Sequence, residues 1–357
     1  MQWLFVDDSS QERTVLAGDL TSGDLEVVPI SGKDARARLA DRTLAPAGIL
    51  MDIELGNETG FLEDGLSLTA AIRADQNREV IGSFPVVRFS RRTKVAEYVG
   101  SDSSSDASFD WAVEKEVISS PEKRRQVQRN LIAFAQVYET VTGTVSLPEA
   151  MGLDSDQWAL FGHSSLTERF RTLDRDHLKA GLVVQAIVTP GVLIDLDLLT
   201  IRLGIRAEAS EGWEKLQREL EAYSYRGAGS ATLQRWWARG VEFWWEDRFG
   251  SDDPLSGLEV EERCSRLSTA FGAFKAIDPV AVSPGKRFWR FCSITKQEYG
   301  EILPVDPEFG VPMTPRTPPL GWEDPLYAAL GPAGQRREDP RLDAEAIERI
   351  QRRCKDT

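Results

Sequence analysis

Four apolar runs near the start of the chain are each followed at once by side chains that could do chemistry. Asp7 and Asp8 follow the first run, Asp52 another, and Ser90 and Lys115 the last two. If these runs are strands of a parallel sheet, the side chains gather outside the carboxyl ends of the strands, where such sheets bind ligands. The spacing therefore predicts one site with three carboxylates, a hydroxyl and an ammonium group.

This combination of groups suits phosphoryl transfer to a carboxylate. Three carboxylates at one edge repel one another, and a hard divalent cation with oxygen ligands, Mg²⁺, would neutralise them. A carboxylate oxygen of Asp52 could then attack phosphorus as a nucleophile and form an acyl phosphate. The Ser90 hydroxyl and the Lys115 ammonium suit the remaining phosphoryl oxygens.

Alternating strands and helices are predicted for the first 115 residues. The apolar runs predict strands at Trp3–Val6, Leu25–Ile30, Gly48–Met51, Pro85–Phe89 and Phe109–Val113. Helices are expected between them at Ser10–Leu20, Lys33–Ala40, Gly65–Ala74 and Arg92–Val99. This order predicts an α/β fold, a five-stranded parallel sheet with helices on both faces. A long helix should follow from Pro121 to about Val141, with Ser119 or Ser120 as its N-cap.

Five short segments in this region resemble the successive signatures of one family. They are WLFVDDSS, GILMDIEL, DGLSLTAAIR, PVVRFS and FDWAVEK. Together they resemble the receiver (CheY-like) domain of response regulators in two-component signalling, over residues 1–141. The resemblance implies a flavodoxin-like fold and a sensor histidine kinase as phosphodonor.

The resemblance also implies a role for each residue of the site. Asp52 corresponds to the phosphoacceptor, and Asp7 and Asp8 to the paired acids that hold Mg²⁺, the implied cofactor. The backbone carbonyl of Glu54 would complete the metal site. Ser90 matches the switch hydroxyl, and Lys115 matches the lysine that contacts the phosphoryl group.

The chain also departs from the family pattern. The proline usual after the phosphoacceptor is missing, and Gly56–Glu63 has the character of an insertion. Arg91 follows Ser90 where a small residue is expected, and Glu116 follows Lys115 where proline is common. Arg88 and Arg91 flank the site and could alter access for a phosphodonor. A receiver fold that keeps its acids without working as a switch is the alternative.

Composition restricts the class of protein. A chain of 357 residues with 41% hydrophobic and 28% charged residues is expected to fold as two globular domains. A net charge of −14 disfavours nucleic acid as a partner, because such binding depends on Lys and Arg. Cys264, Cys292 and Cys354 fit no metal-ligand spacing. We expect a cytoplasmic protein without signal peptide or membrane span.

The predicted domains are a receiver at 1–141, a mainly helical output domain at 149–303, and a tail at 304–357. The boundary is placed in Thr142–Pro148, and the polar segment Gly100–Ala107 is read as a loop inside the receiver. The tail is proline-rich and expected to be extended, with a short helix at Asp343–Cys354. Within the output domain we expect helices at Trp213–Tyr223, at Ala231–Trp245 and from Pro190, and a strand in Lys286–Ile294.

Aromatic residues are dense in the output domain. A helix over Ala231–Trp245 would carry two adjacent aromatic stripes with two arginines beside them. Burial on a wide helix face is one interpretation, and a partner surface is the other, since Trp and Tyr dominate binding hot spots. The residues of that candidate surface are Trp236, Trp237, Trp244, Trp245, Arg235 and Arg239.

Other motifs in the output domain give little support for an active site. A helix from Pro190 would place Asp195 and Asp197 on different faces, which argues against a metal pair. Gly162-His163-Ser164 lacks the second glycine of a nucleophile elbow, and His163 and His177, the two histidines, lie apart.

The sequence therefore predicts a phosphorylation-dependent response regulator whose second domain signals through protein contacts or as a homodimer. No enzyme activity is expected beyond phosphorylation and autodephosphorylation of the receiver. The segments PGVLIDL, RLGI, YSYRGAG and RWW resemble uncharacterised domains of prokaryotic conflict systems. The alternatives are a receiver-gated enzyme, which a polar pocket in the second domain would favour, and a divergent DNA-binding regulator, which a basic stripe would favour.

Overall fold

The computed structural model describes residues 1–56, 63–91, 108–143, 145–278, 285–299, 302–315 and 319–356. They group into two compact units, each built from several segments. The first holds residues 1–155, 166–188 and 226–233, and the second holds 156–165, 189–225 and 234–357. The predicted helix Arg92–Val99, the loop Gly100–Ala107 and most of the insertion Gly56–Glu63 lie outside the described residues.

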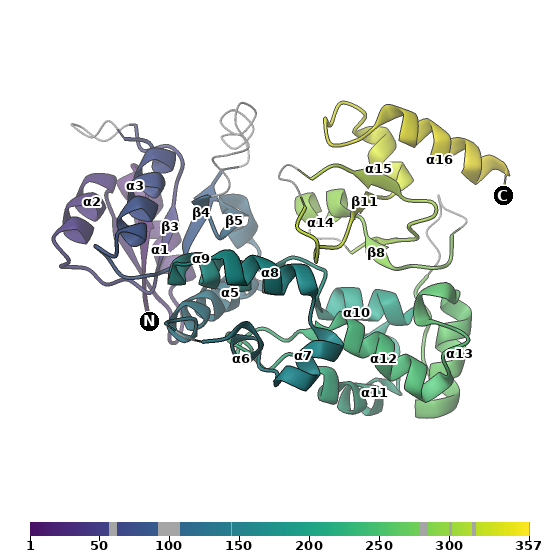
Figure 1. Cartoon of the computed structure of the whole chain (residues 1–357). Helices are drawn as coiled ribbons and strands as arrows, with labels where there is room; N and C mark the ends of the chain where they lie inside the picture. The colour runs from purple at the N-terminus through teal and green to yellow at the C-terminus, as the bar shows by residue number, and fades with distance from the viewer. Residues whose placement is uncertain are drawn as a thin grey trace. The chain divides into compact units, whose positions relative to one another are not determined.

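A five-stranded parallel sheet forms the centre of the first unit (Figure 1). Its strands are β1 (Gln2–Val6), β2 (Glu26–Ile30), β3 (Gly48–Met51), β4 (Val86–Ser90) and β5 (Trp111–Glu114). They pair in the order β2-β1-β3-β4-β5, and every pair is parallel. This is the flavodoxin-like order, with its switch point between β1 and β3. The predicted α/β receiver-like fold is confirmed, and each strand lies within two residues of its predicted bounds.

Helices cover both faces of this sheet. They are α1 (Ser10–Leu20), α2 (Gly32–Ala40), α3 (Gly65–Asn77) and α5 (Pro121–Thr140). Alternate strand residues such as Leu4 and Val6 pack with Leu39 of α2 and Ile72 of α3 in one hydrophobic cluster. Helices α1 and α5 contact each other, and the Gln128 amide of α5 donates to the last carbonyl of α1. Helices α2 and α3 therefore pack on one face of the sheet, and helices α1 and α5 on the other.

Local capping explains why the helix boundaries were predictable. The side chains of Ser9, Ser31 and Asp64 accept hydrogen bonds from the third residue of α1, α2 and α3 respectively. Pro121 stands in the first turn of α5, where its missing N–H leaves no intrahelical hydrogen bond unmade. Ser120 holds the N-cap position of α5 without a side-chain bond to the helix.

Contacts of the first unit continue past the end of α5. Helix α6 (Leu147–Ala150) and helix α9 (Asp176–Val188) belong to this unit, and α9 packs on α5. The Tyr138 hydroxyl of α5 donates to Asp110 at 2.7 Å and lies 3.2 Å from the backbone oxygen of His177 in α9. The contacts within the first unit therefore do not end at Val141, and the predicted domain ranges 1–141, 149–303 and 304–357 stay predictions.

The second unit is mainly helical around an aromatic core. The division of the chain into units falls close to α7 (Ser155–Phe161) and within α8 (Ser164–Thr172). The larger helices of the second unit are α10 (Leu196–Leu203), α11 (Trp213–Leu220), α12 (Ala238–Phe249) and α13 (Val260–Phe271). Single 3-10 turns occur at Ala207–Ala209, Glu221–Tyr223 and Leu255–Gly257. Hydrophobic residues from all four larger helices share one cluster.

The predicted helix over Ala231–Trp245 is wrong in its first half. Trp236 and Trp237 form strand β7, which pairs antiparallel with β6 (Leu193–Ile194), and α12 begins only at Ala238. The four tryptophans of the candidate partner surface are all buried in the core. Their side chains therefore do not form a surface of this unit. Trp244 and Trp245 are buried on helix α12, whereas Trp236 and Trp237 are buried in a strand.

The helix predicted from Pro190 is also wrong at its start. The chain runs through β6, and α10 begins only after Asp195, whose carboxylate accepts from the Leu198 amide at 2.9 Å. Gly191 packs so closely on another loop that a Cβ would lie 2.0 Å from the Trp322 carbonyl oxygen. Asp195 and Asp197 both pair with the Lys296 ammonium, at 3.4 and 2.9 Å. The two acids therefore form an ion-pair cluster.

The last part of the chain is more structured than its proline content predicts. The expected strand in Lys286–Ile294 is limited to β8 (Arg290–Phe291), which precedes α14 (Ser293–Tyr299). Strands β9 (Pro304–Val305), β10 (Val311–Met313) and β11 (Leu326–Ala328) and helices α15 (Leu330–Gln335) and α16 (Ala344–Asp356) follow. They enclose a hydrophobic cluster that includes Cys292, Val311 and Ile347. Over the described stretches, the chain has no helix both long and apolar enough to cross a bilayer.

Candidate functional site

Asp52 lies at the carboxyl end of β3, at the centre of the candidate site. Its backbone amide donates to the Val6 carbonyl at 2.9 Å, which extends the pairing of β3 with β1 by one residue. Gly65, the first residue of α3, packs against the Asp52 backbone, where a Cβ would lie 1.8 Å from the carbonyl oxygen. The glycine in the segment DGLSLTAAIR therefore allows α3 to begin directly beside Asp52.

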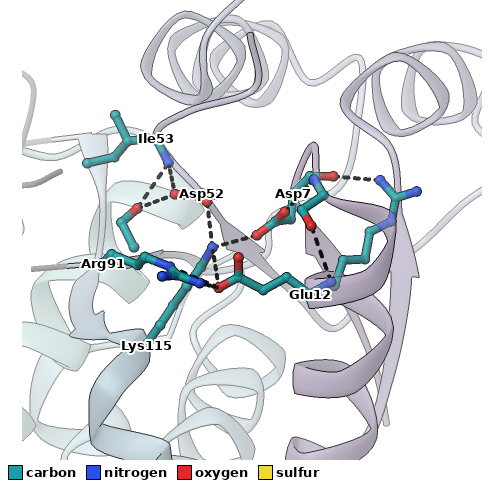
Figure 2. Close-up of polar contacts among 9 residues, drawn as sticks. Asp7, Glu12, Asp52, Ile53, Arg91 and Lys115 are labelled. Carbon is teal, nitrogen blue, oxygen red and sulfur yellow. Dashed lines mark hydrogen bonds and ion pairs between the residues drawn. The ribbon is translucent and has the colours of Figure 1, made fainter. Parts of the chain in front are cut away.

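Lys115 brings two carboxylates together. Its ammonium pairs with both Asp7 Oδ2 and Asp52 Oδ2 (Figure 2), and each distance is 2.5 Å. All three side chains are buried, with residue exposures of 1% for Asp7, 8% for Asp52 and 6% for Lys115. Lys115 begins a 3-10 turn (Lys115–Ser119) directly after β5, so strand ends on both sides of β4 supply this contact.

Ser90 and the Ile53 amide bind the other oxygen of Asp52. The Ser90 hydroxyl donates to Asp52 Oδ1 at 2.8 Å, and the Ile53 amide donates to the same oxygen at 2.7 Å. The Ile53 amide is also 3.0 Å from Ser90 Oγ. Asp52 thus has one oxygen held by an ammonium and one held by neutral donors, and its carboxylate is fixed in orientation.

The electrostatics of the site follow from burial and this pairing. Burial raises the pKa of Asp7 to about 6, although the hydrogen bond and charge of Lys115 act to lower it. Burial alone would lower the pKa of Lys115, but the nearby Asp52 and Asp7 carboxylates outweigh it and raise the pKa. Lys115 therefore stays charged at neutral pH and is the cation that neutralises this edge.

A second ion pair borders the site on its solvent side. Arg91 binds Glu12 Oε1 through Nε at 3.2 Å and Nη2 at 3.1 Å, and the same oxygen is 3.6 Å from Lys115 Nζ (Figure 2). The sequence predicts that Arg91 flanks Ser90, but it does not identify Glu12 as a residue of the site. The spacing of Glu12 from Ser9 fits a helix capping box, and Ser9 Oγ accepts a hydrogen bond from the Glu12 amide.

The remaining predicted metal ligands lie at the same edge. Asp8 follows Asp7 and is half-buried, and Glu54 is half-buried two residues after Asp52. Carboxylate and carbonyl oxygens are the donors that Mg²⁺ prefers, and two buried carboxylates already converge on one cation. The donor set therefore fits Mg²⁺ in type. Among the residues with described positions, no three His, Cys, Asp or Glu side chains form a ready-made metal cluster.

The predicted residues outside this edge are dispersed. Arg235 is half-buried and Arg239 is exposed, while the tryptophans beside them are core residues. Cys264 and Cys292 are buried free thiols, and Cys354 is a half-buried free thiol. His163 lies in the second unit and His177 in the first.

Several solved structures are similar to this chain. The receiver domain of NtrX from Brucella abortus is 25% identical, with 36% of this chain and 97% of that domain covered and a TM-score of 0.27. The N-terminal domain of a response regulator/sensory box/GGDEF three-domain protein from Carboxydothermus hydrogenoformans is 26% identical, with 39% and 98% covered and a TM-score of 0.29.

A longer NtrX structure from Brucella abortus is 21% identical and matches 48% of this chain, with a TM-score of 0.32. The chain spans only 34% of that protein. No protein-family model matches the chain, and no curated protein matches it in sequence. The N-terminal region is a receiver-like α/β domain by its strand order, with an acidic site at the carboxyl ends of its strands.

Proposed function

We propose that the chain is a phosphorylation-dependent response regulator that accepts a phosphoryl group on Asp52. The observation that carries this proposal is the Asp52 carboxylate itself, held between the Lys115 ammonium and the Ser90 hydroxyl at the end of β3. The same two donors are suited to phosphoryl oxygens once Asp52 is modified. Asp7, Asp8, Asp52 and the Glu54 carbonyl would hold Mg²⁺, which supplies charge neutralisation for the incoming phosphate.

The transfer is a nucleophilic substitution at phosphorus. An Asp52 carboxylate oxygen forms a bond to phosphorus while the bond from phosphorus to the donor breaks, and the donor group leaves with the electron pair. With a sensor histidine kinase the leaving group is the imidazole of its phosphohistidine. Hydrolysis of the resulting acyl phosphate by water regenerates Asp52, which makes the signal transient.

Intact-mass measurement tests the acceptor directly. The wild-type protein, incubated with acetyl phosphate and Mg²⁺, should gain the mass of one phosphoryl group, and removal of Mg²⁺ with EDTA should abolish the gain. Asp52→Asn should show no gain, whereas Asp41→Asn, a change at an exposed aspartate after α2, should behave as wild type. Failure of the wild type to gain mass, from acetyl phosphate and from a cognate kinase alike, would disprove the proposal.

The output is proposed to be a change in protein contacts, including homodimerisation. Phosphorylation would bias a two-state surface near Ser90, as expected for a local charge change beside a bistable element. Size-exclusion chromatography with light scattering, with and without beryllofluoride, should show a change of mass or shape in wild type and none in Asp52→Ala. If beryllofluoride changes neither the mass nor the shape of the wild type, the proposed output is wrong. The resemblance of the second unit to conflict-system domains supports a prokaryotic defence setting but names no chemistry.

A receiver-gated enzyme or ligand-binding output is the second candidate. The observation that favours it is a cavity of about 340 Å³ in the second unit, lined by charged and aromatic residues. The burial of the four tryptophans weakens the case for an aromatic partner surface. The net charge of −14 gives no support to a DNA-binding output.

A further inference from the structure

A cavity of about 340 Å³ lies within the second unit, and none of its lining residues belongs to the acidic site of the first. Its walls come from six regions of the chain: α7 and the turn after it, the segment before β6, α10, the first turn of α12, the region of β8, and residues 321–324. The volume is within the range of small-molecule sites. This feature plays no part in the proposed phosphorylation.

Charged side chains with little solvent exposure are concentrated in one wall of the cavity. Arg202 and Arg290 both pair with the Asp324 carboxylate, at 2.6 and 3.0 Å. Arg202 is only 3% exposed, and its guanidinium lies 4.7 Å from the centre of the Trp289 ring. Two guanidinium groups share this one carboxylate, and Glu323 is a further acidic residue of the cavity lining. Buried ion pairs add little net stability compared with apolar packing, which suggests that the cluster has another role.

Arg239 adds a positive charge to the cavity lining. It is exposed in the first turn of α12 and lines the cavity, and no hydrogen bond or ion pair engages its side chain within the described ranges. No side chain caps the N-terminus of α12. The positive end of the helix dipole and the Arg239 guanidinium therefore act on the same side of the cavity.

The lining holds three acidic residues, Glu323, Asp324 and Glu242, against three arginines, and Glu242 is the one on the same helix as Arg239. It lines the cavity one turn after Arg239, and its ion pair with Arg202 is long, at 3.9 Å. Burial raises the pKa of Glu242, and the Asp324 charge acts in the same direction, whereas the Arg202 charge acts to lower it. Phe161 and Trp322 add apolar surface to the lining.

We propose that this cavity binds a small organic molecule that carries an oxyanion, with the oxyanion on Arg239 beside the α12 N-terminus and the apolar part against Phe161 and Trp322. A carboxylate and a phosphate ester share the required chemistry, because a guanidinium binds either through two parallel hydrogen bonds. The wall behind the ligand is held in place by the ion pairs of Asp324 with Arg202 and Arg290. Glu242 limits the affinity through like-charge repulsion.

Ligand-observed NMR titration of the full chain tests the proposal with defined probes. Benzoate and phenyl phosphate represent the two oxyanions, and benzyl alcohol is the neutral control of similar size. Either anion should bind with a measurable dissociation constant, and benzyl alcohol at least tenfold more weakly. The better of the two anions identifies the carboxylate or the phosphate class. Equal binding of benzyl alcohol, or no binding of either anion, would overturn the proposal.

Three variants on one helix separate a site from general charge effects. Arg239→Gln should weaken anion binding about tenfold or more, the loss expected for a charge-assisted hydrogen-bond pair. Glu242→Gln should strengthen it severalfold. Arg248→Gln, near the other end of α12 and outside the cavity lining, should leave it unchanged. Because Arg239 is exposed, its loss should not prevent folding, and equal affinities in the Arg239 and Arg248 variants would contradict the assignment.

Discussion

At the scale of single residues, Lys115 has the largest electrostatic role in the acidic site. It is the counter-ion of both Asp7 and Asp52 in a buried environment. Removing one partner of a buried ion pair leaves charge without compensation, which costs more than the pair contributes. The stability of the first unit should therefore depend strongly on this one ammonium group.

Replacement of Lys115 by methionine tests this dependence. Lys115→Met should lower the free energy of unfolding by about 3 kcal/mol at neutral pH without divalent cations, because two buried carboxylates then face each other. Urea denaturation measures the loss, and Lys33→Met in α2 provides a control at an exposed lysine. Addition of Mg²⁺ should restore part of the stability in Lys115→Met. Equal unfolding midpoints in the two variants would refute the role of Lys115.

Residues of the site could be predicted from the sequence where they directly follow a strand. Asp7, Asp52, Ser90 and Lys115 meet because each lies at the carboxyl end of a strand of a parallel sheet, and that follows from local hydrophobic pattern alone. Glu12 could not be identified in this way. It comes from the first turn of a helix, and its contact with Arg91 depends on how α1 packs beside the end of β4.

At the scale of elements, the join between β3 and α3 depends on one glycine. The approach of Gly65 to the Asp52 carbonyl leaves no room for a side chain. A substitution there must move α3 away from the end of β3. Since Asp52 and the Ile53 amide lie at that point, the geometry of the site and the stability of the unit are coupled.

Gly65→Ala should therefore destabilise the fold by about 2 kcal/mol or more and slow phosphorylation of Asp52, because a Cβ overlaps backbone atoms. Gly18→Ala is the matched control, since Gly18 lies in α1 and a Cβ added there would meet nothing within 4 Å. That change should stabilise the helix by about 0.5 kcal/mol. Urea denaturation and the rate of mass gain with acetyl phosphate measure both effects. The prediction fails if the two variants are equally stable.

Elements of the second unit were harder to predict because their contacts are distant in sequence. Trp236 and Trp237 have the spacing of a helical stripe with Phe243 and Trp244, yet they pair with Leu193 and Ile194 as a short strand. That pairing outweighs local helix preference and is invisible in a window of sequence. The α/β half was predictable because caps and strand alternation are local signals.

At the scale of the whole molecule, the cavity of the second unit could not be predicted from the sequence, because its lining residues lie far apart in the chain. Its lining residues extend from Phe161 to Asp324, and the element boundaries between them include both wrongly predicted helix starts. Arg239 was named from the sequence as the border of an aromatic surface. Arg239 instead lies in the first turn of α12 and lines a cavity, while the tryptophans on both sides of it in the sequence are buried in the core.

The dependence of overall stability on pH should have one identifiable histidine component. Burial lowers the pKa of His177 to about 4, and the nearby Arg73 charge acts in the same direction. In the unfolded chain a histidine has a pKa of about 6.5. Between pH 6.5 and 4 the unfolded state therefore binds a proton that the folded state does not, so stability falls as pH falls through this range. Well above pH 7 both states are neutral and His177 contributes no pH dependence.

His177→Gln removes this component and leaves the backbone oxygen that Tyr138 contacts. Unfolding by urea at a series of pH values should show the wild type losing stability relative to His177→Gln as the pH falls from 6.5 to 4. His163→Gln controls for the loss of a histidine, as the chain has only two. If the stabilities of wild type and His177→Gln stay parallel through this window, another group causes the acid sensitivity, and His177 is not held neutral by its burial against α5.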